Sequence, residues 1–323
     1  MGINKLNITA KRYCNKLFKP VPINFFSGEY VAVDLPIIVS SSHSKQFEKL
    51  VTSIDILNYE ISEEVLEKAT VRDVVSSIKK YFFNNNIKPI LVMDGVAPEL
   101  KTHYARIKRE GVRNAAQIRF KNKLENLKSQ GISFDDIEIK DLDDLIRAKL
   151  QTRRLGKNIY SAVIKALEDA GHYIVYATGE AEELCTKLCL MGKAKAVYST
   201  DTDNIVRKCP MMITKIYYDK DNGNYTTDTI SFSDEIHETI GLNYSSFLDF
   251  CIMMGCDYNN RIKRMTEWYI IEKLFLHGNI ETIEEKTGQD LSSLNYKECR
   301  KLFTERPLEE CCINHDELDL YFP

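Results

Sequence analysis

The sequence is poor in the residues that interrupt regular structure, since its 323 residues include only 14 glycines and 8 prolines. This composition excludes collagen-like and low-complexity chains. Apolar residues make up 44% of the sequence and charged residues 28%, which excludes a wholly disordered chain. No apolar run approaches the length of a membrane span, so we expect no membrane partner. The length suits one large α/β domain or two ordinary ones.

Sequence signatures of zinc and nucleotide binding are also missing. Nine cysteines are present, but none forms a CxxC pair and no Cys/His cluster has zinc spacing. Without a signal peptide, this pattern predicts reduced thiols in the cytosol or nucleus. No Walker A loop occurs, which disfavours an NTPase. Leu6 stands where a myristoylation site needs serine or threonine, so we expect no acylation.

An overall excess of positive charge is missing too. The net charge is −3 and the isoelectric point is near 6.1, which taken alone argues mildly against nucleic-acid binding. This total hides a segment, residues 101–157, in which basic and acidic residues are grouped separately. Residues 101–128 carry nine basic and two acidic residues, residues 129–144 carry one basic and six acidic residues, and residues 145–157 carry five basic residues. We predict two basic helical legs around an acidic crossing, with solvated helix faces as the alternative.

Short buried strands alternate with helices over the first two thirds of the chain. Apolar stripes at helical spacing predict helices over 71–82, 159–170 and 180–191. Short apolar runs predict strands at 30–34, 89–94, 173–176, 195–199 and within 211–232. The alternation predicts an α/β fold with a mainly parallel central sheet and helices on both faces. From residue 233 onward the pattern is helical.

Acidic residues follow several of these predicted strands. In an open parallel sheet the carboxyl ends of the strands open on one crevice, so we expect such side chains to converge. A cluster of carboxylates needs a counter-charge, and Mg²⁺ with its preference for oxygen ligands supplies one. Two such ions about 3.5–4 Å apart activate a water and stabilise the leaving oxygen of a phosphodiester. The candidate ligands are Asp34, Asp94, Glu180, Glu182, Asp201, Asp203 and Asp257.

Local spacing leaves alternatives for these acidic residues. Asp201 and Asp203 share a face only if their segment is extended. Glu180 and Glu182 reach one metal if Glu180 lies in the turn before its helix, whereas a plain helix pairs Glu180 with Glu183. An aspartate after a strand is commonly a turn or cap residue, and glutamates favour a helix N-terminus. The joint pattern is more specific than any of its parts.

Together these segments resemble the flap endonuclease/XPG superfamily of structure-specific 5′ nucleases, over essentially the whole chain. The resemblance rests on YVAVD at 30–34, ILVMDGVAPELKTHYARIKR at 90–109, TGEAEELCTKLCLMGKAKAVYSTDTDNIV at 178–206 and FLDFCIMMGCDY at 247–258. It implies a PIN-like 5′ nuclease core over residues 1–232, with a helical arch or cap inserted at about 101–157. Residues 233–323 would form a helical DNA-binding part with a degenerate helix-two-turn-helix.

The resemblance also implies an activity and its site residues. The seven acidic residues would bind two Mg²⁺ ions, with Mn²⁺ as an alternative. Lys101 would polarise the scissile phosphate, and Lys108 or Arg109 would supply a second cation. A monomer would cut branched or flapped DNA as an endonuclease, and also as a 5′ exonuclease, in replication or repair. Its location would be the nucleus, the host nucleus if the source is a virus, or the cytoplasm. Implied DNA contacts are Gly2, Arg106, Arg113, Arg147, Lys149, Arg153 and Arg154.

Two departures from the family pattern stand out. The family has a glycine-rich hairpin after GCDY that binds duplex DNA with K⁺, but residues 260–268 contain no glycine, which argues against the K⁺ site. Side chains of Arg261, Lys263 and Arg264 would bind phosphate instead, with a basic surface turn as the alternative. The family's stacking tyrosine, about six residues after Asp34, is replaced by Ser40. His43 is then either its substitute or a surface loop residue.

The C-terminal segment and the overall function each leave alternatives open. Residues 315–322 match a sliding-clamp box except for its glutamine, and a closing strand is the favoured alternative. A non-catalytic protein of the same fold that binds branched DNA is the main alternative function. A phosphohydrolase that uses the Asp201/Asp203 pair is a further one.

Overall fold

The computed structural model describes residues 2–3, 6–13, 18–231, 239–262, 265–304 and 306–322. The chain divides into two compact units. The sheet unit comprises Met1–Leu35, Lys80–Ala105 and Ile174–Pro323, and the helical unit comprises Pro36–Lys79 and Arg106–Tyr173. These units are defined by contacts between residues and not by function. The boundary at residue 232 between the nuclease core and the C-terminal part therefore stays a prediction.

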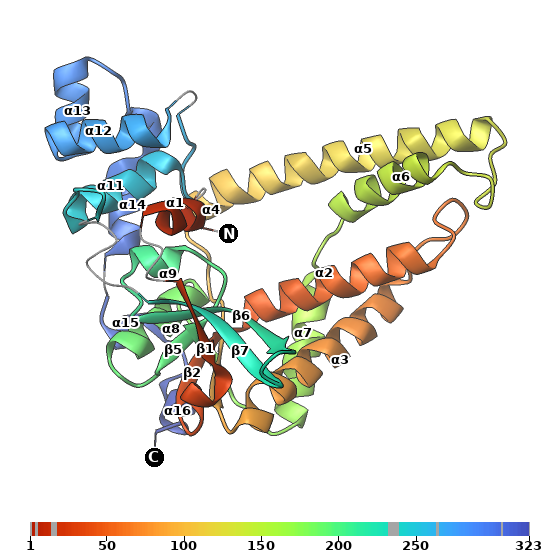
Figure 1. Ribbon diagram of the computed structural model, residues 1–323, viewed down its shortest axis with the longest axis horizontal. Coiled ribbons are helices and arrows are strands. Elements are labelled where there is room, and N and C mark those ends of the chain that lie inside the picture. The colour runs from red at the N-terminus through yellow and green to blue at the C-terminus, as the bar shows by residue number, and fades with distance from the viewer. Residues whose placement is uncertain are drawn as a thin grey trace. The chain divides into compact units, whose positions relative to one another are not determined.

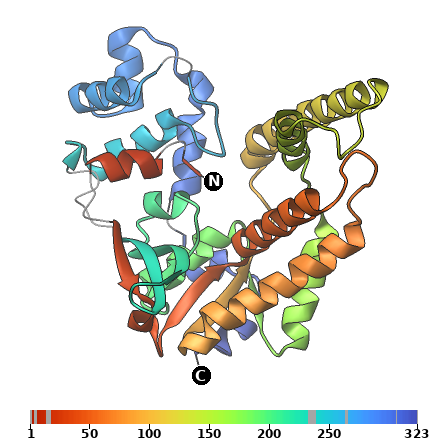
Figure 2. The same cartoon turned by 45° about the vertical axis from the view of Figure 1, so that its right-hand side comes forward.

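The sheet unit is built on a seven-stranded mixed sheet in the order β1-β7-β6-β5-β2-β3-β4 (Figure 1). β2 pairs in parallel with β3 and β5, and β4 and β6 extend this parallel centre on either side. β7 and β1 are antiparallel additions at one edge, visible beside β6 in Figure 2. The strands are β1 Phe18–Pro22, β2 Tyr30–Asp34, β3 Lys88–Met93, β4 Ile174–Tyr176, β5 Ala196–Tyr198, β6 Met211–Asp219 and β7 Asn224–Ser231. The predicted mainly parallel α/β fold is confirmed.

The centre of the sheet is buried because its strands are almost continuously apolar. Val31, Ala32 and Val33 of β2 are fully buried, as expected for a strand covered on both faces. Helix α8 (Ala181–Leu190) contacts β2, β3 and β5. Its inward side chains are those that the helical spacing predicts, Ala181, Leu184, Cys185 and Leu188. All eight cysteines in the described residues are free and buried.

Short helices complete the sheet unit, and three of them begin at a side-chain cap. Asn243, Thr266 and Asn279 each accept a hydrogen bond from the backbone N–H three residues on. The helices are α1 Leu6–Tyr13, α4 Glu99–Lys101, α9 Asp203–Val206, α11 Tyr244–Met254, α12 Glu267–His277, α13 Ile280–Thr287, α14 Tyr296–Phe303, α15 Leu308–Cys311 and α16 His315–Asp319, with 3-10 turns at Ile23–Phe26, Phe83–Asn85 and Ser292–Leu294. The helical pattern predicted after residue 233 is present in the described part.

The predicted closing strand at 315–322 is wrong, because this segment begins with helix α16. Leu318 is its one fully buried residue, and the Tyr30 hydroxyl donates a hydrogen bond to the Tyr321 carbonyl oxygen. The ring of Phe322 lies 5.1 Å from that of Tyr30. The apolar residues of this segment therefore pack through a helical turn rather than along one face of a strand.

The helical unit contains α2 (Leu35–Ser53, of which Leu35 belongs to the sheet unit), α3 (Glu63–Tyr81, up to Lys79), α5 (Ile107–Ser129), α6 (Ile139–Gln151) and α7 (Lys157–Asp169). Helices α5 and α6 lie side by side (Figure 1). A shared core joins α2, α3, α5 and α6 through Phe47, Val51, Leu66, Leu127 and Leu145. An exposed ion pair, Lys123 with Asp144 at 3.1 Å, also links α5 to α6.

Two predictions for the helical unit need correction. The acidic crossing is shorter than 129–144, because Asp141, Asp143 and Asp144 lie inside α6, where acidic residues near a helix N-terminus are favoured. His43 is not a surface loop residue. It is fully buried in α2, its ring stacks on Phe47 four residues on, and its Nδ1 lies 3.1 Å from Arg153 Nη1.

None of the described helices is long and apolar enough to cross a membrane.

Candidate active site

Three aspartates stand at the same edge of the sheet. Asp34 is the last residue of β2, Asp94 directly follows β3, and Asp201 comes three residues after the end of β5. Because β2 pairs in parallel with both β3 and β5, all three strands end on one side. The strand arrangement thus brings together the acidic residues that the sequence placed after separate strands.

Ser199 connects two of these aspartates. Its hydroxyl donates a hydrogen bond of 2.8 Å to Asp34 Oδ2 and accepts one of 3.0 Å from the backbone N–H of Asp201. The N–H of Asp203 then donates to Asp201 Oδ1 at 3.1 Å, and α9 begins at Asp203. The Asp201–Asp203 segment is therefore a helical turn. The extended segment, which the spacing required for a shared face, is not formed, and the turn brings the two side chains together instead.

The two glutamates of the cluster lie on opposite sides of a helix start. Glu180 is extended, with φ −94° and ψ 140°, directly before α8, and Glu182 is buried in the first turn. The N–H of Ala181 between them donates to Asp94 Oδ1 at 2.9 Å. The side chain of Glu183 instead binds Arg306, with distances of 2.7 and 2.6 Å. Glu180 thus lies directly before the helix, as one of the two alternatives required. The other alternative, a side-chain pair of Glu180 with Glu183, is not formed, because Glu183 pairs with Arg306.

Lys101 is the cation of the cluster. Its ammonium lies 2.5 Å from Glu180 Oε1 and 3.9 Å from Asp257 Oδ2. The hydroxyl of Tyr258 donates to the other oxygen of Glu180 at 2.8 Å and is fully buried. Sequence reasoning missed Tyr258 and Ser199 as supports of the carboxylates. Their only signal was position, one directly after Asp257 and the other between β5 and Asp201.

Gly2 lies against the aspartate pair. Its φ of +82° is left-handed, and a Cβ at this position would stand 2.2 Å from Asp201 Oδ1 and 2.6 Å from Asp203 Oδ1. Both observations require glycine. The N-terminal segment therefore borders the acidic cluster directly.

The electrostatics of the cluster are those of crowded carboxylates. Burial raises the pKa of Asp203 well above its ordinary value, and Asp201 raises it further. Burial and then Glu180 do the same to the pKa of Glu182. Burial alone would lower the pKa of Lys101, but Glu182 and Glu180 raise it above its ordinary value. The crowded negative charge of these carboxylates is only partly offset, by the ammonium of Lys101 and by the buried guanidinium of Arg207, which lowers the pKa of both Glu182 and Asp203.

Two buried oxygens of this cluster lack a hydrogen-bond partner among the described residues, Asp203 Oδ1 and Glu182 Oε1. An unpartnered buried carboxylate oxygen is costly, and a divalent cation would satisfy both. As the chain stands, no three Asp, Glu, His or Cys side chains of the described segments are already spaced around a common ion. The oxygen donors of the cluster are of the type that a hard cation prefers, and its binding requires the ammonium of Lys101 to move away from Glu180.

The raised pKa values give the stability of the protein a defined pH dependence. Asp203 and Glu182 have ordinary values of 3.8 and 4.5. Between these and the raised values the folded state binds more protons than the unfolded state, so the free energy of unfolding falls as pH rises. We expect the melting temperature of metal-free protein to fall from about pH 4.5 upward. Mg²⁺ should flatten this slope, because it favours the ionised carboxylates. An equal slope in EDTA and in Mg²⁺ would contradict the expectation.

The basic residues that are predicted to contact DNA differ in their exposure to solvent. Arg106, Lys108, Arg109, Arg147 and Arg154 are exposed in the helical unit, and Arg113 and Lys149 are half-buried. Arg153 is half-buried, and its Nη1 donates to the Ser40 carbonyl oxygen at 3.1 Å. In the sheet unit, the Arg261 guanidinium donates to the Met265 carbonyl oxygen. Lys263 and Arg264 lie outside the described residues.

The sheet order and the buried acidic edge define the chain as an α/β protein built around a carboxylate site. Family models agree with this class, since residues 1–116 match the XPG N-terminal domain and residues 171–257 match the XPG I-region. The chain belongs to the flap endonuclease/XPG superfamily.

Relatives and solved structures cover nearly the whole chain. It is 24% identical to flap endonuclease 1 of Debaryomyces hansenii, covering 99% of this chain and 78% of the relative. It is 27% identical to that of Entamoeba dispar, covering 94% and 75%. The fold is similar to the catalytic core of Rad2 in complex with DNA substrate, with a TM-score of 0.59, 17% identity and coverage of 99% and 81%. It is also similar to flap endonuclease-1 from Methanococcus jannaschii, with a TM-score of 0.54, 19% identity and coverage of 94% and 93%.

Proposed function

We propose that the chain is a metal-dependent, structure-specific DNA endonuclease that hydrolyses phosphodiesters near 5′ flaps or branch points. The observation that carries this function is the acidic edge of the sheet, where buried carboxylate oxygens stand without partners beside Lys101. Membership of the superfamily and the named flap endonuclease relatives support the same activity. A 5′ exonuclease activity belongs to the same proposal.

We assign two Mg²⁺ ions, or Mn²⁺ in their place, to the seven carboxylates of Asp34, Asp94, Glu180, Glu182, Asp201, Asp203 and Asp257. The ions would supply the positive charge that makes a water nucleophilic and stabilises the departing oxygen. The chain itself orients the ligands. Ser199 fixes Asp34 and the backbone of Asp201, and Tyr258 binds the carboxylate oxygen of Glu180 that Lys101 does not contact.

Lys101 has a second task once DNA is bound. Released from its full pairing with Glu180, its ammonium is free to contact the scissile phosphate and to stabilise the charge that develops there. The position of the ammonium supports this role, since it lies 2.5 Å from Glu180 Oε1 and 3.9 Å from Asp257 Oδ2, within the acidic cluster. Lys108 or Arg109 would supply the second cation.

The basic residues of the helical unit are proposed to neutralise the DNA backbone. Phosphate contacts of this kind are independent of sequence and weaken with salt. We expect Arg113→Ala to reduce affinity for a flap substrate about three- to tenfold and to lower the slope of log K against log salt by about one. Fluorescence anisotropy in Ca²⁺ at several salt concentrations measures both. Glu125→Ala, an exposed acidic change on the same helix, is the matched control, and an unchanged salt slope for Arg113→Ala would remove this residue from the DNA surface.

The remaining partners follow from the same proposal. We propose a nuclear monomer acting in replication or repair. A sliding clamp is not included, because the rings of Tyr321 and Phe322, the aromatic pair of its candidate box, contact the ring of Tyr30. Cleavage rates on flap, bubble, gap and four-way junction substrates in Mg²⁺ test the substrate class. Equal rates on branched and unbranched DNA would contradict structure specificity.

A further inference from the structure

A further buried cation, Arg207, lies next to the acidic cluster. It directly follows helix α9, and its side chain is only 7% exposed. Its backbone N–H donates to the carbonyl oxygen of Asp203 at 2.9 Å. The short helix that begins at Asp203 therefore also places Arg207.

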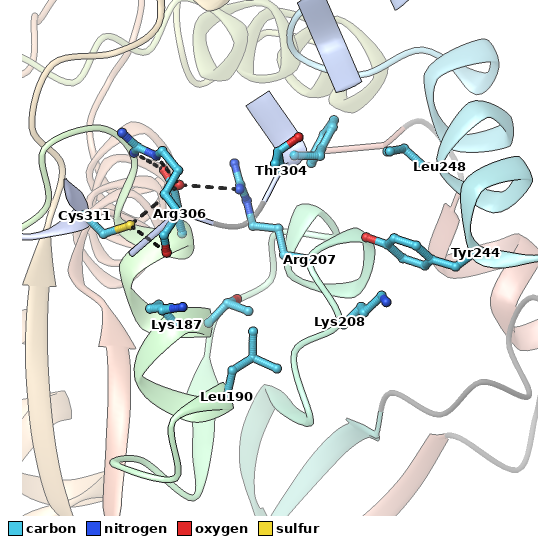
Figure 3. A pocket seen from close by; sticks show the side chains of 12 residues that line it. Lys187, Leu190, Arg207, Lys208, Tyr244, Leu248, Thr304, Arg306 and Cys311 are labelled. Atoms are coloured by element: carbon cyan, nitrogen blue, oxygen red, sulfur yellow. Dashed lines mark hydrogen bonds and ion pairs between the residues drawn. The ribbon is translucent and has the colours of Figure 1, made fainter. Parts of the chain in front are cut away.

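The guanidinium of Arg207 is held in a fixed position by its neighbours. It lies over the Phe303 ring, 5.3 Å from the ring centre. Its Nη1 lies 3.9 Å from Glu183 Oε1, an ion-pair distance that is too long for a hydrogen bond (Figure 3). Glu183 already accepts two hydrogen bonds from Arg306, at 2.7 and 2.6 Å. Because Arg306 shares this carboxylate, Glu183 compensates only part of the charge of Arg207.

Two proposed metal ligands supply further negative charge around Arg207. Burial alone would lower the pKa of Arg207, but the acidic groups around it raise this pKa: Tyr258, Glu183, Glu182 and Asp203. Three buried polar atoms, Arg207 Nε, Glu182 Oε1 and Asp203 Oδ1, have no hydrogen-bond partner among the described residues. Arg207 therefore compensates Glu182 and Asp203 through its charge rather than through a hydrogen bond.

Arg207 differs in this respect from Lys101. The ammonium of Lys101 lies 2.5 Å from Glu180, on a side chain that is 21% exposed, and must move away when a cation binds there. Arg207 has no such freedom, because Phe303 and Glu183 hold its guanidinium inside the protein. Its charge therefore acts on the site both before and after a metal ion binds.

We propose that Arg207 is a positioning residue of the metal site, a fixed internal cation that holds the carboxylates of Glu182 and Asp203 in place when no ion is bound. This inference rests on the assignment of both residues as metal ligands in the proposed function. A nearby positive charge lowers the cost of keeping two buried carboxylates ionised. The same charge repels a divalent cation. Arg207 should therefore stabilise the metal-free protein and lower its affinity for Mg²⁺ at the same time.

Thermal unfolding of the full-length protein in EDTA tests the coupling between Arg207 and Asp203. Arg207→Met should lower the melting temperature by about 6 °C or more, because one partner of a buried charge group is removed. The double variant with Asp203→Asn should melt above the value that the two single changes give when added, because the carboxylate that Arg207 compensates is then also absent. If Arg207→Met alone does not fold, a folded double variant gives the same result. Additive effects would overturn the proposal.

Two further variants separate charge from packing. Arg207→Lys keeps the positive charge and should retain most of the stability in EDTA. A loss as large as that of Arg207→Met would assign the effect to packing over Phe303 and overturn the proposal. Lys208→Met, which removes the adjacent exposed lysine, is the matched control and should show no coupling to Asp203→Asn. Coupling of equal size in this control would also overturn it.

Calorimetric titration with Mg²⁺ adds a measurement that a purely structural role would not change. Arg207→Met should bind Mg²⁺ about three- to tenfold more tightly, because a fixed positive charge near the site is removed. Weaker or unchanged binding would overturn the proposal. Failure of the unaltered protein to bind Mg²⁺ would instead contradict the metal site of the proposed function, whereas the double-variant comparison in EDTA tests the coupling without metal or DNA.

Discussion

Asp203→Asn is expected to abolish Mg²⁺-dependent cleavage and, at the same time, to stabilise the metal-free protein. Asp203 is 2% exposed, and its Oδ1 has no hydrogen-bond partner in the described residues. Burial and Asp201 both raise its pKa, which means that the ionised form is unfavourable in the absence of a cation. Asparagine keeps the shape but removes the charge. The loss in cleavage should be at least about 10³-fold, since a ligand that positions the reactive ion is removed.

The stability change has the opposite sign and provides the sharper test. Removing one of several crowded carboxylates should raise the melting temperature of metal-free protein by about 2–4 °C, the shift that about 1 kcal/mol produces in a large domain. The same variant should lose most of the stabilisation that Mg²⁺ gives to the unaltered protein. Asp221→Asn, an exposed change in the β6–β7 turn, is the control and should alter neither property. Retained cleavage, or a metal-free protein made less stable, would contradict the role of Asp203.

The second large effect is expected from Lys101→Met, which removes the cation of the cluster. Without metal, Glu180 and Asp257 lose their shared ammonium, and breaking a largely buried pair costs up to about 3–5 kcal/mol. Methionine keeps the apolar stem in place. We therefore expect a clear fall in the melting temperature in EDTA and a large recovery on adding Mg²⁺, because the ion takes over the neutralising role. Thermal unfolding with increasing Mg²⁺ measures this directly.

The kinetic consequence of Lys101→Met separates metal binding from catalysis. Cleavage should fall by about 10²–10³, as when a group that stabilises developing charge is removed. Affinity for Mg²⁺ should nevertheless rise, by about tenfold if roughly 1.4 kcal/mol of competition from the ammonium is relieved. Lys220→Met, with an exposed lysine, is the matched control. Weaker Mg²⁺ binding in Lys101→Met would show that the lysine supports the metal rather than competing with it.

The sequence was sufficient to predict the sheet because its central strands are nearly pure apolar runs. The predicted strand at 30–34 agrees with β2 residue for residue, and the other central strands agree within about one residue at each end. Asp34 and Asp94 could be placed at one edge for the same reason, since a residue directly after a parallel strand has a fixed location. The resemblance then supplied the roles of the residues, which spacing alone left open.

The failures arise where tertiary contacts decide the local structure. His43 and its preceding serines look like a polar loop, but they lie in helix α2, where four-residue spacing to Phe47 and contact with Arg153 bury His43. Asp201 and Asp203 adopt a turn because the Asp201 side chain accepts the N–H of Asp203. Such bonds compete with extended structure and are specific to each site.

Incubation of the unaltered protein with a labelled 5′ flap substrate tests the central claim most directly. The acidic edge of the sheet should make cleavage depend on divalent metal, so we expect incision near the branch point in Mg²⁺ or Mn²⁺ and none in EDTA. A flap that persists in both metals over a range of salt, while the protein still binds it, would contradict the claim and leave a branched-DNA binding protein of the same fold.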